Sequence, residues 1–155
     1  MKPSVLLFWV FAALSSKGIG QDHQGKDIEI PLLNAGTVNW PIKLTKQAFE
    51  GDTIYNLTFR DARHNPAGQE SKQGLYIFEL KAFGKALETA LSMGPGYEIR
   101  FNEGVIQIRR SGSGSRRIRI KFAAGTGSFV TTPTNATNLI YTIEKEGRIK
   151  HKGSN

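Results

Sequence analysis

The sequence predicts a mostly β, all-β-class protein: a single-domain antiparallel β-sandwich of about eight strands, with room for one short helix near residues 82–93. Apolar and polar residues alternate at the two-residue strand period along most of the chain. Clusters of Gly, Asn, Asp and Ser separate these runs, as turns between antiparallel strands require. The 155 residues, 39% of them hydrophobic and 22% charged, suffice for one ordinary core.

Residues 1–20 have the pattern of a secretory signal peptide, with a basic start at Lys2, a ten-residue apolar run over 5–14, and small residues before Gln21. Ten residues of helix span about 15 Å, half of a bilayer core. We therefore expect cleavage, a secreted, extracellular domain over 21–155, and no membrane span afterwards. An uncleaved anchor or a buried core strand is the alternative.

The chain has no cysteine, which excludes disulfide scaffolds, cysteine zinc sites and thiol catalysis. Two N-glycosylation sequons, at Asn56 and Asn135, agree with the secretory route and indicate a glycoprotein.

The first strands are expected over 28–32, with a turn at 34–36, and over 38–44. Trp40 shares the apolar face of the latter run, so we interpret it as a core residue, with a sugar-stacking platform as the alternative. After a turn at 50–52, Tyr55, Leu57 and Phe59 predict a third strand with Asn56 facing outward.

Residues 61–74 form the longest polar segment and predict a loop, either solvated or functional. A strand follows over 75–82. For 82–93 the residues favour a short helix, since Ala86, Leu87, Ala90 and Leu91 recur at helical spacing, but Gly84 argues against it and a strand is the alternative.

The run from 97 to 122 predicts a three-stranded meander with turns at 102–104 and 111–115. Beyond it we expect a flexible segment over 123–128, an exposed Thr-rich loop over 131–137 that carries Asn135, a last strand over 139–143 and a turn at 145–147. No internal repeat occurs at a fixed period.

Positive charge is concentrated in this meander. Without residues 1–20, nineteen Lys and Arg stand against thirteen acids, and the meander alone holds seven of the cations and two of the acids. The side opposite its isoleucines predicts a ligand-binding face made of Arg100, Gln107, Arg109, Arg117, Arg119 and Lys121. Arginine forks suit sulfate, carboxylate or phosphate.

These observations predict a heparin-binding or carbohydrate-binding module for a sulfated or acidic glycan or matrix polyanion, because no aromatics interleave the cations as nucleic acid binding would favour. The alternatives are a structural or protein-partner module whose basic face is only solvated, and, third, an enzyme acting through the 61–74 loop. His23, His64 and His151 lack metal-ligand spacing, and no catalytic motif occurs. We therefore predict no enzyme, no metal and no cofactor.

Short segments from Ala86 to Leu91, Tyr97 to Ile99, Ile108 to Arg110 and Leu139 to Ile149, the last including Glu146-Gly-Arg-Ile, resemble the farnesoic acid O-methyltransferase-like domain of secreted animal proteins. The resemblance implies a galectin-like β-sandwich that acts as a recognition module, and it implies a strand in place of a helix over 86–93. The tryptophan usual in that family's last strand is absent here.

Overall fold

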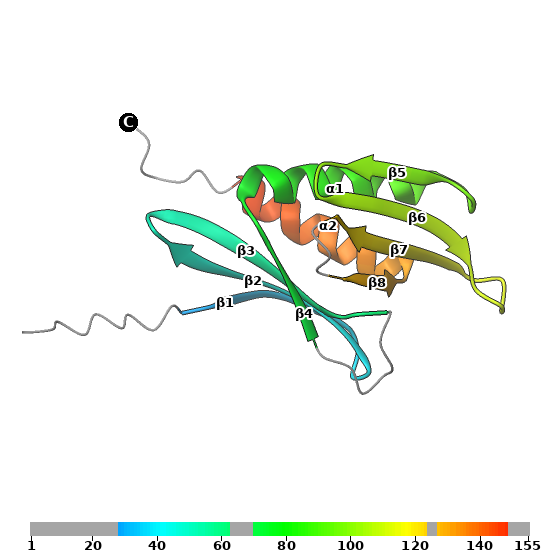
Figure 1. Ribbon diagram of the computed structural model, residues 1–155, viewed down its shortest axis with the longest axis horizontal. Helices are drawn as coiled ribbons and strands as arrows, with labels where there is room; N and C mark the ends of the chain where they lie inside the picture. The colour runs from blue at the N-terminus through cyan, green and yellow to red at the C-terminus, as the bar shows by residue number, and fades with distance from the viewer. Residues whose placement is uncertain (1–27, 63–69, 124–126, 149–155) are drawn as a thin grey trace, which may run out of the picture.

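The computed structural model describes residues 28–62, 70–123 and 127–148. The elements are β1 (Ile30–Thr37), β2 (Trp40–Phe49), β3 (Asp52–Arg60), β4 (Glu70–Leu75), α1 (Ile77–Ser92), β5 (Glu98–Phe101), β6 (Gly104–Arg110), β7 (Arg116–Phe122), β8 (Ser128–Thr131) and α2 (Pro133–Arg148). β1 to β4 form the first sheet and β5 to β8 the second, both antiparallel and in chain order (Figure 1). The predicted mostly β architecture with a helix near 82–93 is confirmed, and a second helix is added.

The chain repeats one unit, a four-stranded meander followed by a helix of 16 residues. The sequence shows no fixed period because the equivalent elements differ in length. β2 has ten residues, for example, whereas its counterpart β6 has seven. The repeated unit can therefore be recognised from the order of the secondary-structure elements but not from the spacing of residues in the sequence.

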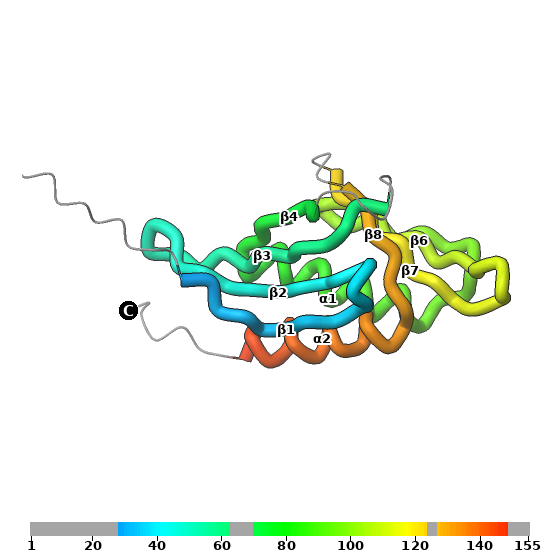
Figure 2. Tube along the Cα trace, turned by 90° about the horizontal axis from the view of Figure 1, so that it is seen from below, coloured from blue at the N-terminus to red at the C-terminus, as the bar shows by residue number. Residues whose placement is uncertain are grey.

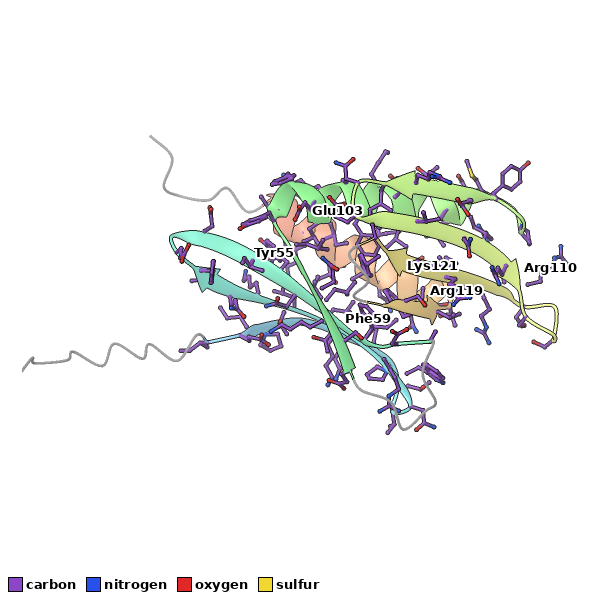
Figure 3. The ribbon with its side chains drawn as sticks, in the orientation of Figure 1. Tyr55, Phe59, Glu103, Arg110, Arg119 and Lys121 are labelled. Carbon is purple, nitrogen blue, oxygen red and sulfur yellow. The ribbon has the colours of Figure 1, made fainter. Side chains whose placement is uncertain are left out.

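The two units share one hydrophobic core. α1 follows the first sheet but packs mainly on β5 and β6 of the second, while α2 contacts β1 and β7, and the helices pack on each other (Figures 1 and 2). Where the sheets meet, the ring of Phe59 lies 5.7 Å from that of Phe122 and 4.8 Å from that of Phe129. Phe59 thus joins the inner faces of both sheets (Figure 3).

The first helix begins earlier than the sequence predicts. The expected strand over 75–82 is wrong beyond Leu75, because the backbone turns helical at Ile77. The carboxylate of Glu79 accepts the backbone N–H of Tyr76 at 2.7 Å and satisfies one of the free donors at the helix start. Gly84 allows close packing, since a Cβ there would lie 3.0 Å from Cγ2 of Ile143 in α2.

The second helix replaces three expected elements: the loop over 131–137, the strand over 139–143 and the turn at 145–147. Thr132 caps it, its Oγ1 accepting the backbone N–H of Asn135 at 3.2 Å, and Pro133 occupies the first helical position, where its missing N–H costs nothing. The strands implied by the family resemblance over 86–93 and 139–143 are likewise helical.

The hairpins of the first sheet differ from the expected ones at one turn. β1 runs through the predicted turn at 34–36 and turns instead at Val38 and Asn39, with Thr37 opposite Trp40. The turn predicted at 50–52 is present: Glu50 and Gly51 have φ of 49° and 89°, as a tight two-residue hairpin requires. β4 occupies the end of the segment that was expected to be a loop over 61–74.

A buried polar cluster fixes α2 against the inner face of the first sheet. Nζ of Lys46 donates to Oε2 of Glu146 at 2.9 Å, and the hydroxyl of Tyr55 donates to the same oxygen at 3.4 Å. Burial, together with the charge of Glu146, raises the pKa of Tyr55 to about 12. Glu146, only 5% exposed, is therefore an anchor within the helix.

Candidate functional site

The meander predicted over 97–122 is present as β5, β6 and β7. Phe101 pairs with Gly104 across a two-residue turn, as expected. Gly104 does not have a positive φ, and glycine is needed here for a different reason. It is required because a Cβ there would collide with the carbonyl oxygen of Lys121 on β7. In the second turn, Gly114 does adopt a positive φ, of 80°.

The strand register aligns the predicted site residues in rows across the second sheet. Arg109 pairs with Arg117, and Gln107 lies between Glu98 and Arg119. In the next row Val105 lies between Arg100 and Lys121. The isoleucines between these positions are buried on the opposite face, where the helices pack.

The structure thus brings all six predicted site residues onto one surface, which we call the basic face: Arg100, Gln107, Arg109, Arg117, Arg119 and Lys121. Gln107 lies in the middle row of this face, on β6. Its amide donates to Glu98 at 2.9 Å, and its oxygen accepts from Arg109 at 3.0 Å. Figure 3 shows Arg119 and Lys121 along β7.

The basic face is poorly neutralised by the protein itself. Its one ion pair among the described residues joins Arg100 to Glu98 at 3.5 Å, and the side chain of Arg100 is 84% exposed. Arg119 donates weakly to Ser128 at 3.4 Å, and its buried Nε has no partner in the described part of the chain. Most of the positive charge on this face is therefore not neutralised by a protein carboxylate within the described residues.

Two cations of the meander do not belong to the basic face. Arg116 turns inward, and its guanidinium donates to the carbonyl of Leu91 at 2.8 Å and to those of Ala90 and Met93, at the end of α1. A cation at this position neutralises the negative end of the helix dipole. Arg110 is exposed beyond the last row, apart from Arg119 and Lys121 (Figure 3).

The basic face also borders two concave regions, a shallow groove and a larger cleft. A groove of about 380 Å³ runs beside β5 and β7 and is lined by Arg100, Gln107 and Lys121. A second, larger cleft of about 530 Å³ lies between the edge of the second sheet and the β1–β2 hairpin, and Arg117 lines it from the basic face. The predicted residues therefore border two concave regions.

Trp40 is the functional candidate that the sequence interpretation assigned wrongly. It is not in the core: 38% of it is exposed, and it lines the larger cleft. The signal was its place directly after the turn at Val38-Asn39, at a strand end that the other layer of the protein does not have to cover.

Little in the described residues supports chemistry at the 61–74 loop. His23, His64 and His151, and residues 63–69, lie outside the described residues. Asp61 is buried, and its Oδ1 accepts the backbone N–H of Ser128 at 3.2 Å, which ties β3 to β8. In the described part of the chain, no three potential metal-ligating side chains gather.

The two sequons occupy different environments. Asn56 lies on the outer face of the first sheet, as predicted, but is only 5% exposed, and its amide donates to Gln47 at 2.9 Å. Asn135 is half-buried in the first turn of α2, beside the larger cleft. The predicted signal peptide over 1–20 lies outside the described residues.

No protein-family model and no curated protein sequence matches this chain. Among the described helices, none is long and apolar enough to cross a bilayer. The site must therefore be interpreted from its own geometry and charge.

Proposed function

We propose that this chain is a secreted binding protein whose basic face recognises a linear polyanion, most specifically a sulfated or acidic glycan. One observation carries the proposal: the register places five cations on outward positions of β5, β6 and β7, and among the described residues of these three strands Glu98 is the only acid.

The array suits an extended anion better than a compact one. Neighbouring strands lie about 4.8 Å apart and same-face residues of one strand about 6.8 Å apart, so the five cations spread over several ligand units. Arg109 and Arg117 face each other directly, and like charges in opposed positions destabilise a sheet. A bound chain of sulfate or carboxylate groups relieves that repulsion and gains bidentate hydrogen bonds from the arginines.

A glycan is favoured over nucleic acid because the basic face has no aromatic side chains on which bases could stack. Successive nucleobases need repeated aromatic platforms, and the outward positions of β5 to β8 carry no aromatic side chain. The expected signal peptide and sequons also direct the chain to the compartment in which sulfated glycans occur.

Retention on heparin resin tests the proposal, with two variants matched in charge. R109Q/R119Q removes two cations from the basic face, and K43Q/K72Q removes two from the outer face of the first sheet. We expect the first variant to elute at clearly lower salt and the second to elute like the wild type. For the first variant, the slope of log affinity against log salt should decrease by roughly one per contacting cation removed.

Equal losses in the two variants would show that only net charge matters and would overturn the proposal, as would R109E/R117E/R119E eluting like the wild type. A soluble competition distinguishes the ligand classes. A sulfated oligosaccharide should displace the protein from the resin at lower concentration than a single-stranded oligonucleotide of equal charge, and the reverse order contradicts the glycan assignment.

A further inference from the structure

The larger cleft combines side chains of different chemistry at the edge of the basic face. It holds about 530 Å³ and is lined, among others, by Trp40 and Ile42 of β2, Arg117 of β7, Val130 of β8, and Thr132 and Asn135 at the start of α2. Its lining residues come from the β1–β2 hairpin, β7, β8 and the start of α2. Its size is that of a site for a small ring or two.

Trp40 is held in place by its hairpin. Its backbone N–H donates to Oγ1 of Thr37 at 3.2 Å, and its carbonyl lies so close to Gly36 that a Cβ at Gly36 would collide with it. Gly36 has a φ of 89°, which favours glycine. The indole is therefore presented from a fixed backbone, with 38% of the residue exposed.

Arg117 connects the cleft with the basic face. It lies on the outward side of β7 opposite Arg109, and it also lines the cleft. Among the described residues no carboxylate lies within ion-pair distance of its guanidinium, so its charge is available to an anion at this place. Thr132 and Asn135 add short polar side chains on the α2 side.

We propose that this cleft is a subsite for one acidic sugar residue of the glycan, a uronate or a sulfated ring, which rests on the proposed function of the basic face. The indole of Trp40 packs on the apolar face of the sugar ring, Arg117 pairs with its carboxylate or sulfate, and Thr132 and Asn135 bind its hydroxyl groups. The rest of the glycan continues from Arg117 onto the basic face.

Intrinsic fluorescence provides a direct test, because the chain has two tryptophans and W9F in the full chain leaves Trp40 alone. Protein from a bacterial host carries no glycan at Asn135. Titration of W9F with a heparin-derived disaccharide should change the emission of Trp40 in a saturable way. R117Q in the W9F background should weaken this binding at least about tenfold, as loss of a charged hydrogen-bonded pair does, whereas K72Q, on the outer face of the first sheet and outside the proposed site, should leave it unchanged.

The outcomes separate the two proposals. Retention on heparin resin without any response of Trp40 to the disaccharide overturns the subsite and leaves the basic face standing. A wild type that is not retained overturns the basic face itself. An equal response to the desulfated, carboxyl-reduced disaccharide contradicts the anionic ligand, and a response to mononucleotides alone would assign the cleft to a nucleobase. W40L should abolish disaccharide binding measured by calorimetry.

Discussion

The outer faces of the two sheets differ in how their cations are paired. On the first sheet, Nζ of Lys43 lies 3.2 Å from Oε1 of Glu70, and Lys72 donates to Glu29, a contact that lowers the pKa of that carboxyl. On the second sheet, Arg109 faces Arg117, and no ion pair is found for either within the described chain. Among the described residues, the first face pairs its lysines with acids, whereas most cations of the second face have no ion-pair partner.

On the inner face of the first sheet, Lys46 forms an ion pair with Glu146 of α2. Of the substitutions proposed below, breaking this pair should lower the free energy of unfolding the most. E146Q leaves Lys46 beside a neutral amide, with the lysine side chain 25% exposed. Removing one partner of a fully buried ion pair costs about 3–5 kcal/mol, so for this partly exposed pair we expect the free energy of unfolding in urea to fall by about 2–3 kcal/mol.

E144Q is the matched control on the same helix, because Glu144 forms an exposed pair with Arg148 at 3.6 Å. Its loss should stay below about 1 kcal/mol. If the two variants lose the same stability, the internal pairing of the first sheet is not a stabilising feature and the contrast between the sheets weakens.

The same cluster predicts a pH dependence of stability. Because the folded protein raises the pKa of Tyr55 to about 12, it favours the neutral phenol. This contribution is complete below the unfolded pKa of about 10 and is lost as the pH rises from about 10 to 12, which amounts to about 1–3 kcal/mol. Y55F should lose less unfolding free energy than the wild type over that interval, and parallel pH curves for the two proteins would contradict the assignment.

Three strands of the second sheet, β5 to β7, could be predicted from the sequence, and the reason is local. The fourth strand, β8, was missed because the expectation there was a flexible segment over 123–128 followed by a loop from 131. Ile106, Ile108, Ile118 and Ile120 alternate strictly with polar residues, so the strand period fixes both the strands and the face that each cation occupies. What the sequence could not show is that Arg116 turns inward to the end of α1, because that depends on where the helix ends in space.

The two helices and the cleft were harder to predict for different reasons. The Thr-rich start of α2 resembles a loop, although Thr132 followed by Pro133 is a helix start signal and Ala136, Leu139 and Ile143 share one helical face. Trp40 follows the period of the core-facing residues of β2. Its exposure depends on how far the opposite layer reaches, which no periodicity contains.

A single substitution on the second sheet should separate stability from binding. R109E replaces the like-charge pair with Arg117 by an opposite-charge pair, so the free energy of unfolding should rise by about 0.5–1 kcal/mol while retention on heparin falls. K121E is the control, because the cross-strand neighbours of Lys121 are Val105 and Ser128. It should lower retention without stabilising the fold. Destabilisation by R109E would indicate that the facing arginines do not repel each other.

The smallest effect is expected from making the first sheet resemble the second. E29Q/E70Q removes the carboxylates that pair with Lys72 and Lys43 and leaves two free lysines on that outer face. Exposed pairs contribute little, so the free energy of unfolding should change by less than about 1 kcal/mol. In the R109Q/R119Q background, the double substitution should restore part of the lost heparin retention. R109Q/R119Q with E144Q and E88Q, which removes two exposed acids from the helices, controls for net charge. Equal recovery in the two would mean that heparin responds to total charge, whereas greater recovery with E29Q/E70Q would show that unpaired cations on one sheet face are what a polyanion recognises.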